Sequence, residues 1–114
     1  MENSNIVEEG KTIAIISYVT LIGLIIAIVM NNDKKNSFAS YHIRQSIGIL
    51  VLYFLVWVFF YIVSYIFYIP FLSTILYVGV LVLWILGILA AVQGETKPVP
   101  LVGEKFQEWF KNIG

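Results

Sequence analysis

The stretch between Phe38 and Ile69 constrains the fold of this chain more than any other. An amphipathic lead, residues 38–45, runs without a helix breaker into about 24 uncharged residues, enough to cross a bilayer. Because Pro70 is the only proline before Pro98, a single helix of about 32 residues, about 48 Å long, can form here. A hydrocarbon core is only about 30 Å thick, so we expect the polar lead to lie in the headgroup region.

Composition places the whole chain in a membrane. Of its 114 residues, 60% are hydrophobic and only 12% are charged, and the mean hydropathy is +0.89. A soluble surface needs far more charge, and three uncharged runs have the length of a membrane span. We therefore predict an all-α membrane protein, a single integral membrane domain over residues 1–114. Its transmembrane helices are expected at residues 12–30, 46–69 and 71–92, with the second helix starting near residue 38.

The residues after the third run predict one further helix, at about 101–113. Apolar side chains recur there on one face, while acidic residues and lysines occupy the other. A helix this short and this charged does not span a bilayer. We expect it to lie in the cytoplasmic membrane interface, with Phe106, Trp109 and Phe110 inserted into the lipid.

Small side chains predict where the helices touch. Lipid does not drive apolar helices together, so small residues mark the faces on which backbones approach closely. The first run carries such residues on one side, and the third run carries a small-xxx-small pair with a tryptophan on the same face. The residues predicted to pack helix against helix are Ser17, Thr20, Gly23, Ala27, Trp84, Gly87 and Ala91.

The cations predict an orientation. Three spans would place six of the seven Lys and Arg residues on one side and leave Lys11 alone on the other. Short loops rich in Lys and Arg remain in the cytoplasm. We therefore expect the loop at 31–45 and the C-terminus to be cytoplasmic and the N-terminus to lie outside.

His42 is the only candidate for a general base. Gln45 and Ser46 follow it by one turn of helix, but no carboxylate within a turn orients the imidazole, and no oxyanion donor is evident. One His without any Cys offers too few ligands for a metal ion. We predict no enzymatic activity, metal or cofactor, and the zero net charge argues against a nucleic-acid partner.

The polar lead of the second run has three possible uses. Its side chains can form hydrogen bonds in the membrane interface, contact a partner protein, or line the mouth of a cavity. The candidate residues for contact with a partner or for a cavity mouth are Phe38, Tyr41, His42, Arg44 and Gln45.

A set of short motifs resembles the Tic-twenty-like family. A first apolar run and a short polar turn precede a Phe-x-x-x-His-x-x-Gln entry at Phe38, His42 and Gln45, and the third run ends in small residues, Gly, Glu and Pro at 90–100. This family of small bacterial membrane proteins is related to a component of the chloroplast inner-envelope protein import machinery, and it includes small magnetosome membrane proteins. The resemblance implies a multi-pass protein of the bacterial inner membrane, without established enzymatic activity.

Two functions fit the sequence. The first is a non-enzymatic accessory or assembly subunit of a membrane complex, related to protein import or translocation, whose partners are the lipid bilayer and other membrane protein chains or its own copies. The alternative is a homo-oligomeric pore or transporter for small solutes. The polar residues that would line its lumen are Ser17, Thr20, Ser64, Ser73 and Thr74.

Overall fold

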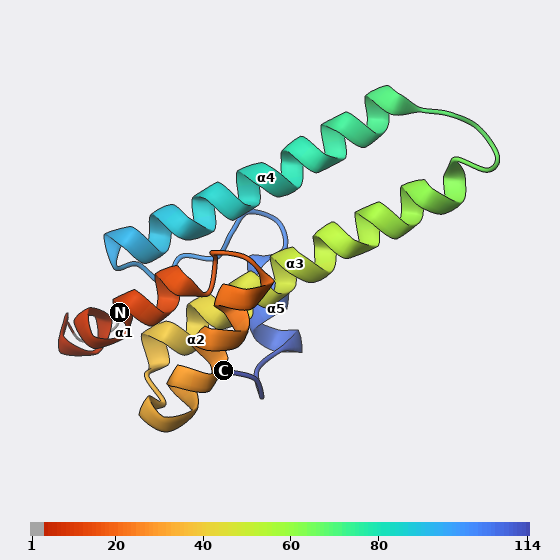
Figure 1. Cartoon of the computed structure of the whole chain (residues 1–114). Helices are drawn as coiled ribbons and strands as arrows, with labels where there is room; N and C mark the ends of the chain where they lie inside the picture. The colour runs from red at the N-terminus through yellow and green to blue at the C-terminus, as the bar shows by residue number, and fades with distance from the viewer. Residues whose placement is uncertain (1–3) are drawn as a thin grey trace.

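The computed structural model describes residues 4–114, which fold into five α-helices with no strand among them (Figure 1). The all-helical prediction is confirmed for these residues. The molecule is elongated, with extents of 52 × 23 × 22 Å. The helices are α1 (Ser4–Ile16), α2 (Leu21–Lys34), α3 (Ser37–Val63), α4 (Pro70–Gln93) and α5 (Gly103–Trp109).

The molecule has two parts, which we call the head and the arm. The head comprises residues 4–49 and 80–114, and so contains α1, α2, α5, the start of α3 and the end of α4. The arm comprises residues 50–79, in which α3 and α4 run side by side to the loop that joins them (Figure 1). Within the described chain, every buried residue belongs to the head and none to the arm.

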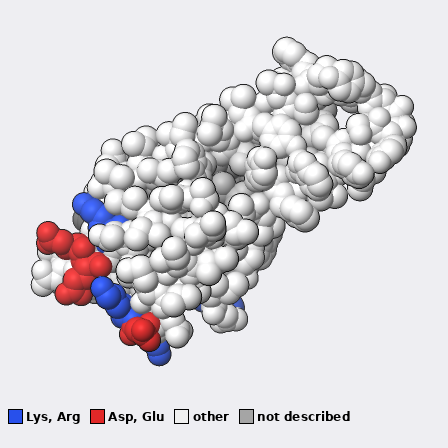
Figure 2. Space-filling model, in the orientation of Figure 1, with Lys and Arg blue, Asp and Glu red and all other residues white. Residues whose placement is uncertain are grey.

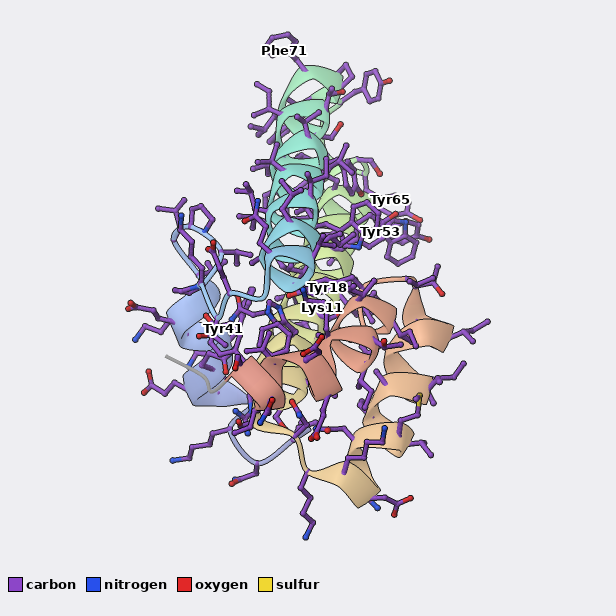
Figure 3. All side chains as sticks on the ribbon, turned by 90° about the vertical axis from the view of Figure 1, so that its left-hand side faces the viewer. Lys11, Tyr18, Tyr41, Tyr53, Tyr65 and Phe71 are labelled. Atoms are coloured by element: carbon purple, nitrogen blue, oxygen red, sulfur yellow. The ribbon has the colours of Figure 1, made fainter. Side chains whose placement is uncertain are left out.

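The arm is uncharged and exposes large apolar side chains. Large side chains such as Phe54 and Phe71 are 58% and 78% exposed, and Phe71 lies at the far end of the arm (Figure 3). No Asp, Glu, Lys, Arg or His occurs in residues 45–94, and Figure 2 shows the charged side chains at the opposite end of the molecule. By length and composition, α3 and α4 are each able to cross a membrane.

The prediction of a transmembrane helix at 12–30 is wrong. The chain leaves the helical conformation at residues 17–20, so α1 and α2 have 13 and 14 residues, and each is too short to cross a bilayer. The second helix runs back beside the first. Just beyond α2, the Asn36 Nδ2 donates a hydrogen bond of 2.8 Å to the carbonyl of Ile6, near the start of α1. The described chain therefore contains two candidate spans and not three.

Side chains from other helices stabilise the break between α1 and α2. The end of any helix leaves carbonyl groups without partners inside that helix. Here the Ser46 hydroxyl of α3 donates to the carbonyl of Ser17, and the Trp84 Nε1 of α4 donates to the carbonyl of Tyr18 at 2.7 Å. Contacts with α3 and α4 thus take the place of the hydrogen bonds that a continuous helix would have made.

The two long helices begin close to where the sequence predicts. α3 begins at Ser37, one residue before the expected start, because the Asn36 Oδ1 caps it by accepting a hydrogen bond of 2.9 Å from the Ala39 N–H. It ends at Val63 instead of residue 69, and the Ser64 hydroxyl then donates to the carbonyl of Tyr61. α4 has Pro70 in its first turn and ends at Gln93, followed by Gly94 in the left-handed conformation, so it matches the predicted span at 71–92.

The C-terminal helix is shorter than predicted and packs on the head. α5 has seven residues, and Phe106 is only 4% exposed because its ring lies against Gly48 of α3, where any Cβ would overlap it. Trp109 is exposed and Phe110 is half-buried. Of the three aromatic residues expected at the interface, Phe106 therefore belongs to the core of the head. The helix begins only at Gly103 because residues 94–102, which include Pro98 and Pro100, form a loop.

Most of the small residues predicted to pack are buried. Ser17, Gly23, Ala27, Gly87 and Ala91 all lie inside the head. A Cβ at Gly87 would lie 2.7 Å from the Tyr18 ring, so this glycine lets the ring pass between α1 and α4. The other two predicted residues lie elsewhere: Thr20 is exposed at the break, and Trp84 is partly exposed where the arm begins.

Candidate functional site

Buried polar side chains gather at the start of α3, within the head. Each turn from Asn36 to Ser46 sends a side chain to a different segment of the protein. Because buried polar groups cost free energy unless they are paired, the pairing partners decide how the segments are arranged. We call this set the polar hub; its members are Tyr18, Asn31, Asn36, Ser40, His42, Gln45 and Ser46.

His42 lies at the centre of the polar hub and is fully buried. Its Nε2 is 2.7 Å from the carbonyl oxygen of Glu95, and its Nδ1 is 2.7 Å from the Tyr18 hydroxyl. A carbonyl can only accept, so Nε2 carries the proton and donates. Burial raises the pKa of the Tyr18 phenol, which remains protonated and donates to Nδ1. The neutral imidazole therefore links the α1–α2 turn to the segment after α4.

Gln45 fastens the segment that leads into α5. Its Nε2 donates to the carbonyl of Gly103 at 2.7 Å, and its Oε1 accepts from the N–H of Val99 at 3.0 Å. A Cβ on Gly103 would lie 2.9 Å from the same Oε1, so glycine is needed for this approach. The oxygen and the nitrogen of the Gln45 amide thus both form hydrogen bonds with the segment that follows α4.

Three further polar residues tie α2 and the C-terminus to α3. The Asn36 N–H donates to the Asn31 Oδ1 at 2.8 Å, and the Asn31 Nδ2 donates to the Ser40 hydroxyl at 2.8 Å. The Ser40 hydroxyl in turn donates to the carbonyl of Gly114 at 2.9 Å. One continuous line of hydrogen bonds therefore joins the end of α2, the start of α3 and the last residue of the chain.

The structure separates the five residues singled out in the polar lead. Phe38, His42 and Gln45 are buried, and both His42 and Gln45 form their hydrogen bonds within the chain. Arg44 lies at the edge of the head and donates to the carbonyls at 111 and 113, each at 3.1 Å. Tyr41 is half-buried, and its hydroxyl has no hydrogen-bond partner within the described residues. Tyr41 and Arg44 remain the members that a partner could reach.

A pocket of about 210 Å³ lies where the arm leaves the head. The residues that line it come from the α1–α2 turn, α3 and α4, and their side chains are mostly apolar. In Figure 2 the surface is hollowed between head and arm, and no charged atom borders the hollow. The lining includes Tyr18, Thr20, Ser46, Ile49, Tyr53, Tyr77, Val80 and Trp84.

Sequence reasoning missed Tyr18, Asn31 and Asn36. A signal was present, because Ser17, Tyr18 and Thr20 place three polar side chains in the middle of an otherwise apolar run. Helical spacing assigned two of these to a packing face and left Tyr18 without a role. The sequence places both asparagines in a short polar turn between two apolar runs, whereas both are buried in the polar hub.

Comparison with known proteins identifies the family. Neither the curated proteins nor the solved structures include a match to this chain. Residues 9–106, from α1 to Phe106 of α5, match the model of one protein family over most of the chain. The matched segment contains the whole polar hub and the arm. This chain therefore belongs to the magnetosome magnetite crystal formation protein family.

Proposed function

We propose that this bacterial membrane protein is a non-enzymatic accessory or assembly subunit of a membrane complex. In this proposal the arm crosses the inner membrane as a two-span hairpin, and the head lies on the cytoplasmic side. The observation that carries it is the contrast between an uncharged arm with no buried residue and a head that holds every charged residue of the described chain.

Charge supports the cytoplasmic position of the head. All seven Lys and Arg residues lie in the head: Lys11, Lys34, Lys35, Arg44, Lys97, Lys105 and Lys111. The loop at 64–69, at the other end of the arm, has none. Since Lys and Arg near membrane helices stay in the cytoplasm, the loop faces outside. This orientation replaces the expectation of an N-terminus outside, because both ends of the described chain lie at the head (Figure 1).

The hydrogen bonds of the polar hub support a non-enzymatic role. A general base needs a free nitrogen, whereas both nitrogens of His42 are engaged within the protein. The neighbouring hydroxyls of Ser17 and Ser46 donate to backbone carbonyls. These groups stabilise the packing of the head through hydrogen bonds within the chain. We therefore infer that the protein acts by binding and not by catalysis.

The same kind of observation favours an accessory subunit over a pore. Ser64, Ser73 and Thr74 would have to face a lumen, but each hydroxyl donates to a carbonyl three or four residues earlier in its own chain. The import relationship implied by the resemblance in the sequence is kept as part of this proposal. Tyr41 and Arg44, both half-buried at the edge of the head, are the residues that a partner would contact.

Single-cysteine labelling tests the topology. The chain has no cysteine, so each variant carries one thiol. In spheroplasts treated with a membrane-impermeant maleimide, Tyr68→Cys in the loop should be labelled from outside. Glu8→Cys, Asn32→Cys and Asn112→Cys should be labelled only after permeabilisation. Labelling of Glu8→Cys from outside would restore three spans and refute the proposed hairpin.

Purification in a mild detergent, followed by measurement of the mass of the intact complex, tests the accessory role. We expect other protein chains to accompany this one, and a photo-crosslinker at Tyr41 to reach them. A matched crosslinker at Ile22, on the exposed side of α2, controls for general surface proximity. A symmetric complex of this chain alone that carries solute across liposomes would support the pore instead.

A further inference from the structure

The pocket between head and arm has the shape and chemistry of a site for a hydrocarbon chain. An apolar cavity of about 150 Å³ is large enough to hold a benzene-sized molecule, and this pocket has a volume of about 210 Å³. Its lining contains no charged residue. On α3 it extends from Ser46 to Tyr53, about 10 Å along the helix. The long direction of the pocket therefore follows the arm.

Three of the six polar side chains that line the pocket already form hydrogen bonds within the protein. The Tyr18 hydroxyl donates to His42, the Trp84 Nε1 donates to the Tyr18 carbonyl, and the Ser46 hydroxyl donates to Ser17. These bonds keep the head side of the pocket rigid and leave its inner surface apolar. Water has few partners on the head side of the pocket, whereas a methylene chain needs none.

Three hydroxyls at the rim are not engaged. Thr20, Tyr53 and Tyr77 line the pocket, and their hydroxyls form no hydrogen bond within the described chain. Figure 3 places Tyr18 at the base of the arm and Tyr53 further along it, so the rim follows the arm outward. Thr20 also has φ 125° and ψ 178°, a backbone conformation that is strained for any residue but glycine and that recurs at ligand sites.

We propose that this pocket holds one acyl chain of a bilayer lipid, lying along the arm between α3 and α4. The inference rests on the proposed function, because the pocket meets the acyl layer only if the arm crosses the membrane. Its position supports lipid as the occupant. The lining continues without a charge into the exposed surface of the arm, so a chain can enter sideways from the bilayer.

Retention of lipid after purification tests the proposal. The protein is reconstituted with phosphatidylglycerol carrying 16-carbon chains, extracted again into lipid-free detergent, and weighed by native mass spectrometry. We expect one lipid per chain. Val80→Phe, which fills the pocket from α4, should lower lipid retention about tenfold. This is the loss of affinity expected when about two methylene groups of the lipid are no longer buried in the pocket. Val78→Phe, on the exposed side of the same helix, should retain lipid normally.

A second variant guards against misfolding. Leu50→Trp closes the edge of the pocket from a position that is already 36% exposed, so it does not overpack the core. Leu55→Trp, in the arm and outside the lining, is its control. Normal lipid retention by both folded pocket variants would overturn the proposal, as would a second protein chain in place of the lipid.

Fluorescence gives an independent readout at the site. Trp57→Phe combined with Trp109→Phe leaves Trp84, in the pocket lining, as the only tryptophan. After reconstitution with acyl-brominated phosphatidylglycerol and re-extraction, retained lipid should still quench Trp84, and Val80→Phe should abolish the quenching. If cysteine labelling shows the proposed topology but no quenching persists, the lipid site fails alone. If cysteine labelling instead places Glu8→Cys outside the cell, the proposed function fails.

Discussion

The head and the arm differ in the contacts that hold their helices together. Both contain apolar helices, but in the head α1 and α2 pack against α3, and hydrogen bonds join distant segments, such as His42 to Tyr18 and to Glu95. In the arm, α3 and α4 contact each other along one side and leave rings such as Phe54 exposed. In the described arm, every side-chain hydrogen bond joins residues that are three or four positions apart in the sequence.

This difference indicates which solvent each part needs. The head has a core of its own and pairs most of its buried polar groups, so its arrangement is specified by contacts within the protein. The arm has no buried residue, and exposure of its side chains to water would cost about 25 cal/mol for each Å². We therefore expect its stability to depend on lipid. Substitutions of similar chemistry should have different effects in the two parts.

The largest difference is expected between two aromatic residues of α5. Phe106→Ala removes a ring from the core of the head and should lower the free energy of unfolding by about 3–5 kcal/mol. Trp109→Ala, 64% exposed on the same helix, should change it by less than about 0.5 kcal/mol in detergent. Denaturant titration monitored by circular dichroism measures both, and equal effects would mean that α5 is not docked on the head.

A lysine in the arm tests its need for lipid. Leu55→Lys should disfavour membrane insertion by about 3–4 kcal/mol, because it replaces a favourable side chain with a charged one near the centre of a span. Ile26→Lys, also exposed and apolar but on α2, should have a smaller effect because α2 is not a candidate span. Insertion is measured by the glycosylation of engineered acceptor sites. A larger loss for Ile26→Lys would contradict the two-span assignment.

Loss of one amide should loosen the head without affecting the arm. Gln45→Leu keeps the side-chain volume but leaves the N–H of Val99 unpaired and removes one hydrogen bond to the carbonyl of Gly103, at a cost of about 2–3 kcal/mol. Gln93→Leu, exposed near the end of α4, is the matched control. Hydrogen exchange at Val99 should accelerate only in the first variant. Unchanged protection would show that Gln45 does not fasten this segment.

The smallest expected effect concerns a single hydrogen bond. Trp84→Phe removes the donor to the Tyr18 carbonyl and should cost about 1 kcal/mol, since the aromatic ring is kept. Trp57→Phe makes the same change in the arm, where the described indole donates no hydrogen bond, and should have almost no effect. Thermal unfolding of both variants in one detergent makes the comparison, and identical midpoints would remove Trp84 from the account of the break at 17–20.

Much of the architecture was predictable from single stretches of sequence. The uncharged residues of α3 and α4 indicate two membrane helices, because length and hydropathy decide that property locally. Pro70 lies in the first turn of α4, next to the start predicted at residue 71. Gly23 and Gly87, predicted from their size to lie at packing faces, are buried: Gly23 lies against the carbonyl of Ile16 and Gly87 against the Tyr18 ring.

The break at 17–20 was not predictable in the same way. Ile13 to Met30 contains no proline, its one glycine lies after the break, and its length alone fits a span. The carbonyls freed by the break find their donors on Ser46 and Trp84, far along the chain. The candidate site was not fully predictable for the same reason. Helical spacing assigned His42 and Gln45 to a polar stretch, but it did not identify Tyr18 and Gly103, the partners that these side chains meet inside the head.

The sequence by itself determined that this protein is helical, that two of its apolar runs are long enough to cross a membrane, and where its charges lie, since these properties depend on runs of neighbouring residues. Only the tertiary structure decided that the first apolar run folds back on itself and that the polar lead of α3 points into the head. The physical reason is that a buried polar group adopts the conformation in which it is paired, and for Tyr18, His42 and Gln45 the pairing partners belong to other segments of the chain.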